Sequence, residues 1–364
     1  MRIVFAGGGT GGHIYPALAV ADEMKSRFDS FNPLFVGTRA GLESEIIEEF
    51  GYSLRFIVSG PMRGRKFWRR IGTLSGMAAG MIQSIIIISR FKPDLVIGFG
   101  GYASVSVVVA ASVLGKAIVL QEQNSIPGLT NRMLSRFAER IYLGFNHAAR
   151  FFSDREKLLH TGNPLRSVIT EEYEGDAAAA FGLAGDLPVL LAFGGSQGAS
   201  SLNRAALEYI RSTGGVQMII QTGKRDYRMM KSELSGFGDR VFVTDYIKNI
   251  REAYEAADIV ISRAGALSVS EIASVGIPAI LVPYPFSADN HQVENARYLE
   301  EAGGAVMVED SELSGERLGA ILDNILSDRQ RIGSMAEAAR SRGINEAARK
   351  IVDDIESILE RKSG

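Results

Sequence analysis

Three glycine-rich turns each follow a short apolar run in this chain, and their recurrence limits what the chain can fold into. The turns are Gly7–Gly12, Gly98–Gly101 and Gly194–Gly198. Glycine lets the backbone turn sharply and approach a ligand closely, and a helix that begins after such a turn points unpaired N–H groups toward it. Each turn is therefore a candidate phosphate-binding loop.

Apolar runs alternate with helical segments along the whole chain. The runs that predict strands are 3–6, 34–36, 95–97, 118–120 and 141–143 in the first half, and 189–193, 218–221, 241–243, 259–262 and 279–282 in the second. Short apolar runs separated by helices are typical of parallel strands covered on both faces. Because 364 residues exceed one ordinary core, we predict an α/β fold with two doubly wound domains that face a central cleft.

The boundary between the two domains is predicted after residue 163. Gly162–Pro164 follows the last strand of the first set and precedes a polar, alanine-rich stretch, as linkers often do. The predicted domains are therefore 1–163 and 164–342. A last helix, predicted over 343–364, carries one apolar stripe that must dock on another surface and could return to the first domain.

Composition excludes several classes of site. Cysteine is absent, which removes disulfides, thiolate metal sites and a cysteine nucleophile. The four histidines show no metal-ligand spacing and no Asp-x-Asp triplet occurs, so neither a metal nor another cofactor is expected. A net charge of −2 gives no general attraction to nucleic acid.

The membrane relationship predicted from the sequence is peripheral. The chain opens directly on a strand-like run, so no secretory signal is expected. The uncharged stretch 71–89 is just long enough to span a bilayer, but its glycine and polar residues favour a packed helix.

Two of the turns also match motifs of other enzymes. Gly7, Gly9 and Gly12 fit the dinucleotide pattern G-x-G-x-x-G, but Arg39 stands where an acid should bind the ribose, so an NADP-dependent dehydrogenase remains an alternative.

The third turn matches the nucleophile elbow G-x-S-x-G at Ser196, and Asp245 and His291 follow in the order that a serine hydrolase needs. That interpretation leaves His13 and the first-half turns without a role, and a phosphate-binding serine needs neither partner. A serine hydrolase stays an open alternative.

Two further positions carry candidate chemistry. His13 closes the first turn where a helix begins, and the positive helix end favours the neutral imidazole that a general base needs. A histidine that only hydrogen-bonds a loop is the alternative. In 262–271 a strand ends, and the chain turns at Gly265 and enters a helix. This arrangement offers N–H groups to a phosphate or sugar and the carboxylate of Glu271 to a ribose.

A cluster of basic and aromatic residues lies between residues 63 and 70. Aromatic residues among basic ones suit an anionic membrane surface. We expect six of these residues to contact such a surface: Arg65, Lys66, Phe67, Trp68, Arg69 and Arg70. Arg132, Arg136 and Arg140, spaced by four as on one helix, are expected to add to the same face. An ordinary solvated face is the alternative.

Six segments in this order resemble the MurG family of bacterial glycosyltransferases, and the resemblance covers nearly the whole chain. The segments are 8–13, 98–102, 122–124, 162–166, 194–198 and 263–271. The resemblance implies a GT-B fold of two Rossmann-like domains, with the last helix crossing back to the first domain, and no bound metal. It implies transfer of N-acetylglucosamine from UDP-N-acetylglucosamine to lipid-linked N-acetylmuramyl-pentapeptide in peptidoglycan synthesis, at the cytoplasmic face of the plasma membrane. A UDP-sugar epimerase of the same fold is the alternative.

The resemblance also implies which residues bind the two substrates. The residues expected to contact the donor are Thr10, Gly11, Gly12, Asn124, Arg166, Ser196, Ile247, Ala266, Leu267, Glu271, His291 and Gln292. Among them, the Ile247 backbone is expected at the uracil and Glu271 at the ribose, while His291 stands where some members have a glutamine. The residues expected around the acceptor diphosphate are Gly9, Gly12, Gly100, Gly101 and Tyr102. His13 is the candidate base.

Overall fold

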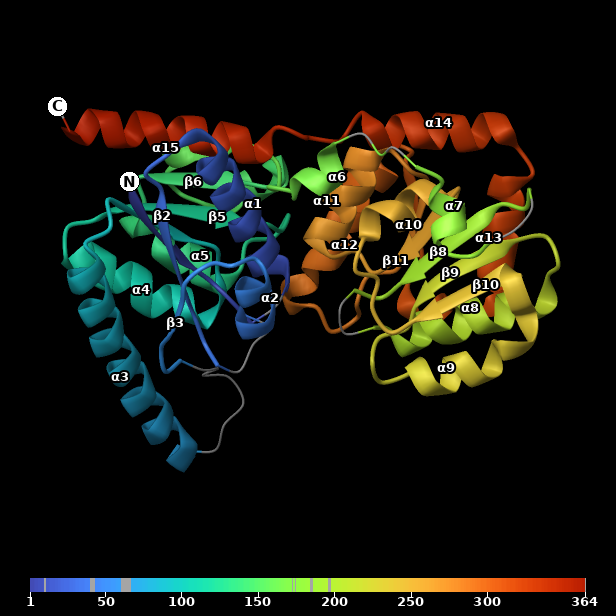
Figure 1. Cartoon of the computed structure of the whole chain (residues 1–364), viewed down its shortest axis with the longest axis horizontal. Helices are drawn as coiled ribbons and strands as arrows, with labels where there is room; N and C mark the ends of the chain where they lie inside the picture. Colours follow the sequence, from blue (N-terminus) through green and yellow to red (C-terminus); the bar gives the residue numbers. More distant parts are fainter. Residues whose placement is uncertain are drawn as a thin grey trace. The chain divides into compact units, whose positions relative to one another are not determined.

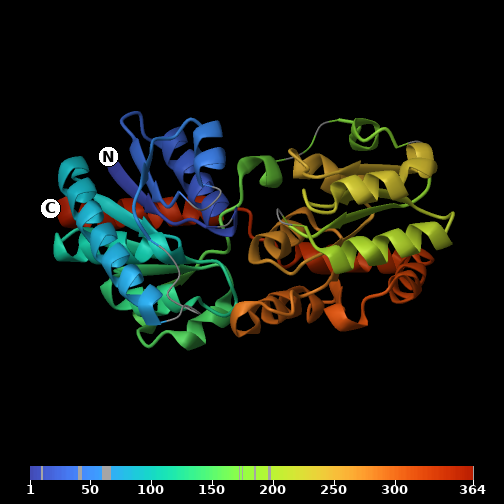
Figure 2. The same ribbon diagram turned by 90° about the horizontal axis from the view of Figure 1, so that it is seen from below.

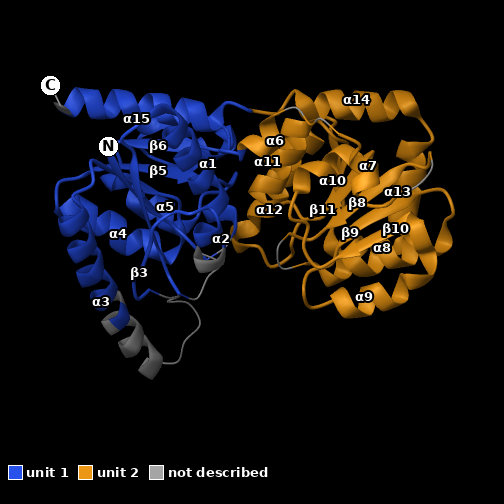
Figure 3. Cartoon of the chain, in the orientation of Figure 1, with its two compact units in different colours: residues 1–166, 345–364 blue, residues 167–344 orange. Residues whose placement is uncertain are grey.

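The computed structural model describes the backbone of residues 1–9, 11–39, 43–59, 67–171, 173, 175–183, 186–195 and 198–363. Within these ranges the side chains at 43–45, 67–75, 77 and 363 are left undescribed. The chain divides into two compact units (Figure 3). Unit 1 comprises residues 1–166 and 345–364, and unit 2 comprises residues 167–344.

Unit 1 alternates strands and helices (Figure 1). Its elements are β1 (Arg2–Ala6), α1 (Gly11–Arg27), β2 (Asn32–Gly37), α2 (Glu43–Glu49), β3 (Leu54–Phe56), α3 (Phe67–Phe91), β4 (Leu95–Gly98), α4 (Gly101–Val113), β5 (Ala117–Glu122), α5 (Leu129–Leu134), β6 (Arg140–Leu143), β7 (Leu158–His160) and α15 (Ala347–Ser363).

The sheet of unit 1 is parallel, with the strand order β3-β2-β1-β4-β5-β6-β7. Its central strands are buried on both faces, which explains their continuous apolar runs. One face packs against α1, α2 and α15 through Leu18, Ile47 and Ile351, and the other packs against α3, α4 and α5. Figure 2 shows the red C-terminal helix behind this sheet.

Unit 2 repeats the same architecture. Its elements are α6 (Ser167–Thr170), α7 (Ala177–Ala180), β8 (Val189–Phe193), α8 (Ser200–Ser212), β9 (Gln217–Gln221), α9 (Tyr227–Glu233), β10 (Val241–Thr244), α10 (Ile250–Ala256), β11 (Ile259–Ser262), α11 (Ala266–Val275), β12 (Ala279–Leu281), α12 (His291–Glu300), β13 (Ala305–Met307), α13 (Gly315–Leu326) and α14 (Arg329–Arg340). The parallel sheet has the order β10-β9-β8-β11-β12-β13.

The predicted α/β fold with two parallel sheets is confirmed. The units divide between residues 166 and 167, so Arg166 belongs to unit 1 and not to the second unit as expected. The last helix begins at Ala347, later than the predicted residue 343. Ile344 therefore precedes it, and the buried stripe of α15 includes Ala347, Ile351 and Ile355.

Candidate functional site

In unit 1 the first two glycine turns lie side by side at the carboxyl edge of the sheet. They follow β1 and β4, which are neighbours at the point where the strand order reverses. Ligands of doubly wound sheets bind in the crevice at such a point. The turns are joined directly, because the Phe99 N–H donates to the Ala6 carbonyl over 2.8 Å and the Ser104 hydroxyl lies 2.6 Å from the same oxygen.

The geometry fixes the tautomer of His13, which lies in the first turn of α1. Its Nδ1 is 2.8 Å from the carbonyl oxygen of Gly8. A carbonyl can only accept, so Nδ1 carries a proton, and in the neutral form of the ring Nε2 is the basic nitrogen. That is the form of histidine that can take a proton from a hydroxyl.

Two positions of the second turn need glycine because the turn that carries His13 packs closely against them. Gly100 and Gly101 have φ angles of 93° and 78°. A Cβ on Gly100 would lie 3.2 Å from His13 Nε2, and one on Gly101 would lie 2.8 Å from the Gly8 carbonyl oxygen. The predicted role of these glycines at the acceptor diphosphate stays a prediction, while their packing against the His13 turn is a structural requirement.

Tyr102 and Arg166, two other predicted site residues, both lie in unit 1. Tyr102 is the second residue of α4 and is 49% exposed, so its side chain is open to a ligand. The guanidinium of Arg166 lies over the ring of Tyr15 on α1, 4.8 Å from its centroid. This contact places the Arg166 charge beside the helix that carries His13.

Asn124 is held by Glu122, a residue whose role was not predicted. Glu122 ends β5 and is fully buried. One carboxylate oxygen accepts the Asn124 N–H at 2.9 Å, and the other accepts the Gly128 N–H at 3.1 Å and the Asn131 amide at 2.9 Å. Burial raises the pKa of the Glu122 carboxyl, and these hydrogen bonds partly oppose the rise. Glu122 thus fixes the loop between β5 and α5 that presents Asn124.

In unit 2 the third glycine turn follows β8 and lies beside the end of β11, again where the strand order reverses. Gly195 has a φ of 76°, and a Cβ on it would meet nothing within 4 Å, so the turn is open at this residue. Gly198 is the opposite case, because a Cβ there would lie 2.2 Å from the Thr222 carbonyl oxygen. The helix α8 begins just after this turn at Ser200.

Gln221, the buried last residue of β9, connects the predicted donor contact Ile247 to the third glycine turn. Its side-chain oxygen accepts the Ile247 N–H at 2.8 Å, and its amide nitrogen donates to the Gly195 carbonyl at 3.0 Å. The Ile247 N–H is therefore engaged, which leaves the Ile247 carbonyl as the backbone group that can meet a uracil. A polar residue at the carboxyl end of an apolar run was the sequence signal for Gln221.

The helix α11 carries three predicted donor residues of unit 2. Ala266 and Leu267 lie in its first turn, where the backbone N–H groups of a helix have no intrahelical acceptor and can bind an anion. Glu271, on the same helix, accepts a hydrogen bond from the Tyr254 hydroxyl at 3.0 Å.

His291 and Gln292 begin α12 after two residues with positive φ, Asp289 and Asn290. Nδ1 of His291 lies 2.8 Å from the Ala288 carbonyl, and Gln292 accepts the Tyr284 N–H at 2.8 Å. Both side chains are thus anchored to the loop before α12, which limits how they can turn toward a sugar.

Several predicted residues lie outside the described parts of the chain. These are Thr10, Ser196, Arg65 and Lys66, together with the side chains of Phe67, Trp68, Arg69 and Arg70.

The prediction that Arg132, Arg136 and Arg140 share one helix face is wrong. The helix α5 ends at Leu134, and Arg140 opens β6. Arg140 instead pairs with Asp354 of α15 at 3.0 Å.

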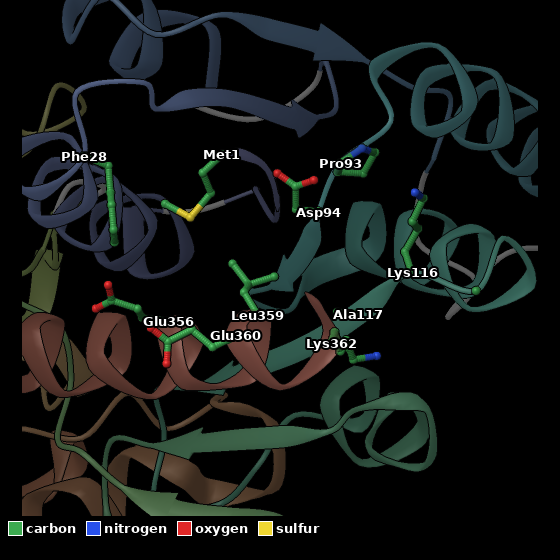
Figure 4. A pocket seen from close by; sticks show the side chains of 11 residues that line it. Met1, Phe28, Pro93, Asp94, Lys116, Ala117, Glu356, Leu359, Glu360 and Lys362 are labelled. Carbon is green, nitrogen blue, oxygen red and sulfur yellow. The ribbon is translucent and has the colours of Figure 1, made fainter. Parts of the chain in front are cut away.

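A hollow of about 650 Å³ in unit 1 lies away from the predicted site (Figure 4). Met1, Asp94 and Lys116, which line it, precede β1, β4 and β5, while Leu359 and Glu356 come from α15. The hollow is therefore at the amino edge of the sheet, opposite His13. None of the predicted site residues that the structure describes lines it.

Within the described ranges, no three histidine or acidic side chains gather closely enough to hold a metal ion. Among the helices in the part of the chain that the structure describes, none is both long and apolar enough to cross a membrane.

Comparisons with known proteins cover the whole chain. Residues 3–143 match the glycosyltransferase family 28 N-terminal domain, and residues 189–355 match its C-terminal domain. The UDP-N-acetylglucosamine–N-acetylmuramyl-(pentapeptide) pyrophosphoryl-undecaprenol N-acetylglucosamine transferase of Desulforamulus reducens is 38% identical, with 100% of each chain covered. The transferase of the same name from Chlorobaculum parvum is 40% identical, with 98% of each chain covered. The chain belongs to the MurG family of glycosyltransferases.

Solved structures agree with membership of the MurG family. The MurG of Acinetobacter baumannii is 26% identical and superimposes with a TM-score of 0.76, covering 98% of this chain and 99% of that one. A UDP-N-acetylglucosamine 2-epimerase from Listeria monocytogenes, 15% identical with a TM-score of 0.73 and covering 99% and 97%, shares the fold. The predicted GT-B fold is thus confirmed, and MurG-family membership does not favour the serine hydrolase or the epimerase.

Proposed function

We propose that this glycosyltransferase moves N-acetylglucosamine from UDP-N-acetylglucosamine to the C4 hydroxyl of undecaprenyl-pyrophosphoryl-N-acetylmuramyl-pentapeptide, in peptidoglycan synthesis. The full-length match to relatives named for this transfer carries the proposal. The reaction inverts the configuration at the anomeric carbon of the transferred sugar. The acceptor oxygen bonds to that carbon as the bond to the phosphate oxygen breaks, and UDP leaves with the electron pair.

Unit 1 supplies the base in this mechanism. The hydroxyl proton passes to Nε2 of His13, whose Nδ1–H is held by the Gly8 carbonyl at 2.8 Å. The ring then becomes an imidazolium that donates from both nitrogens. Gly9, Gly12, Gly100, Gly101 and Tyr102 are the proposed contacts of the acceptor diphosphate.

Unit 2 supplies the main donor contacts in this proposal. Glu271 accepts the ribose hydroxyls, the Ile247 carbonyl takes the uracil N–H, and the open turn at Gly195 together with the α11 N-terminus stabilises the diphosphate. Ala266 and Leu267 then contact the sugar, with His291 and Gln292 beside it. Thr10, Gly11, Gly12, Asn124, Arg166 and Ser196 remain predicted donor contacts.

The polyprenyl acceptor requires a membrane surface, and we place the docking face on the segment 65–70 and on α3. In the described part of α3, Ile82 and Ile86 lie one turn apart and are 59% and 44% exposed. Exposed apolar side chains on the helix that follows basic residues in the sequence suit shallow insertion among anionic lipids. The proposed location is the cytoplasmic face of the plasma membrane.

Release of UDP tests the proposal. The protein is incubated with UDP-N-acetylglucosamine in the presence and absence of the lipid acceptor, and UDP should form only with the acceptor. The rate should be the same in EDTA as in magnesium. Consumption of the UDP-sugar without acceptor, with appearance of an epimer, would establish the epimerase instead. Labelling of Ser196 by a fluorophosphonate would establish the hydrolase.

A further inference from the structure

Tyr254 carries a hydroxyl that the core of unit 2 does not need. Its side chain, on α10, is 1% exposed and is among the largest buried side chains of the chain. Phenylalanine would fill nearly the same volume without a polar atom. A buried hydroxyl stabilises a fold only when it finds a partner, since an unpaired one costs roughly 1–3 kcal/mol.

The partner of this hydroxyl is the carboxylate of Glu271. The Tyr254 hydroxyl donates to Oε2 of Glu271 over 3.0 Å, from α10 to α11. Glutamate has several rotatable bonds, and a ligand that orders them loses binding energy to side-chain entropy. A hydrogen bond from a rigid, buried donor sets the orientation of the carboxylate before a ligand binds, and a carboxylate can accept more than one hydrogen bond.

The ring of Tyr254 is fixed by the strand that leads into the third glycine turn. It meets the ring of Phe193 edge to face, with centroids 6.0 Å apart and an interplanar angle of 75°. Phe193 is the last residue of β8, directly before Gly194. The Glu271 carboxylate is therefore linked to the end of β8 through the hydrogen bond to Tyr254 and the ring contact between Tyr254 and Phe193. The open turn at Gly195 follows this strand end.

We propose that Tyr254 is a positioning residue that holds Glu271 for the two ribose hydroxyls of the donor nucleotide. It thereby contributes to the preference for a ribonucleotide over a 2′-deoxyribonucleotide. The proposal rests on the proposed function, which places the donor ribose at Glu271. Tyr254 touches the protein carboxylate and is not itself a contact of the reacting atoms.

The test compares the binding of UDP and 2′-deoxy-UDP by calorimetry. In the Tyr254→Phe variant, UDP affinity should fall on the order of fivefold to tenfold, as expected for the net contribution of one ordinary hydrogen bond. Affinity for 2′-deoxy-UDP should fall less, so the ratio between the two ligands shrinks. Adding Tyr254→Phe to Glu271→Ala should cause no further loss, because the two residues act through one interaction.

Tyr142→Phe is the matched control. Tyr142 is also buried, and its hydroxyl also donates to a carboxylate at 3.0 Å, that of Asp354, but in unit 1. Both variants should lower the thermal midpoint, and only Tyr254→Phe should change the ligand ratio. An unchanged ratio in a folded Tyr254→Phe protein overturns the positioning role alone. Failure of the parent protein to bind UDP overturns the proposed function, and the positioning role with it.

Discussion

The side-chain oxygen of Gln221 accepts the backbone N–H of Ile247 at 2.8 Å, inside the unit that we expect to bind the donor. Its amide nitrogen donates to the Gly195 carbonyl, so one buried side chain joins the loop after β10 to the turn after β8. Gln221 therefore fixes the positions of the two loops relative to each other before a ligand that contacts both of them binds.

Replacing Gln221 by methionine should therefore weaken donor binding. The change leaves the Ile247 N–H and the Gly195 carbonyl without this partner, and each lost bond is worth about 0.5–1.5 kcal/mol. The donor KM should rise roughly tenfold, with a smaller change in kcat. Initial rates at varied UDP-N-acetylglucosamine measure this. Gln217→Met is the control, because Gln217 is buried at the other end of the same strand and donates to Leu187. If KM rose equally in both variants, the effect would come from a general loss of fold stability and not from the contacts of Gln221 with the two loops.

Replacing His13 by alanine should lower kcat by about 10²–10⁴-fold, as expected for loss of a general base, with little change in donor KM. Turnover is followed as UDP release with the lipid acceptor. A variant with near-normal turnover would remove His13 from the mechanism.

Gly100→Ala should impair turnover through the same histidine. Its Cβ would enter a backbone with a φ of 93° and lie 3.2 Å from His13 Nε2. We expect kcat to fall roughly tenfold or more while UDP affinity stays unchanged. Gly115→Ala is the matched control, since its φ of 64° imposes similar strain but nothing lies within 4 Å of the added atom. Equal losses of activity in the two variants would assign the effect to backbone strain.

Glu122 should give the unfolding midpoint a pH dependence. Burial raises its pKa above the usual 4.5, so the folded chain retains a proton that the unfolded chain releases. This stabilisation is complete below the unfolded pKa and is lost as the pH rises through the folded pKa. The Tm of the parent minus that of Glu122→Gln should therefore fall as the pH rises above 4.5, the usual pKa of the group. A difference that grew with pH would mean that the donors around the carboxylate outweigh its burial.

Changing Arg65, Lys66, Arg69 and Arg70 to serine should weaken binding to anionic liposomes. Cations near an anionic surface contribute about 1 kcal/mol each, and salt screens them. Sedimentation with vesicles at low and high salt measures the loss. Turnover on a short-chain soluble acceptor should persist. If the variant bound liposomes as well as the parent does, the segment would be an ordinary solvated surface and not the membrane contact.

The sequence predicts most of this fold because buried parallel strands leave continuous apolar runs. The strands it missed are short and lie at or near the sheet edges. In β3 (Leu54–Phe56), for example, no residue is fully buried, so selection for an apolar run is weak. The prediction of one helix carrying Arg132, Arg136 and Arg140 was wrong because a spacing of four residues is common by chance. Arg140 belongs to a strand.

Site residues were predictable where they lie in the turns themselves. The placement of His13 in the first turn follows from the motif, but its tautomer depends on the Gly8 carbonyl and is visible only in the structure. Tyr254 could not be found, since its partner Glu271 lies 17 residues later on another helix. Supporting residues of this kind are chosen by three-dimensional contact, and no local pattern marks them.

The return of α15 to unit 1 determines the order in which the chain can fold during synthesis. Residues 1–166 leave the ribosome first, yet their core lacks Ile351 and Ile355 until the final helix emerges. Residues 167–344 are continuous and can close before that. Unit 1 is thus begun first and completed last. A premature stop before Ala347 would leave it with an uncovered apolar face, and we expect such a fragment to be degraded or to aggregate.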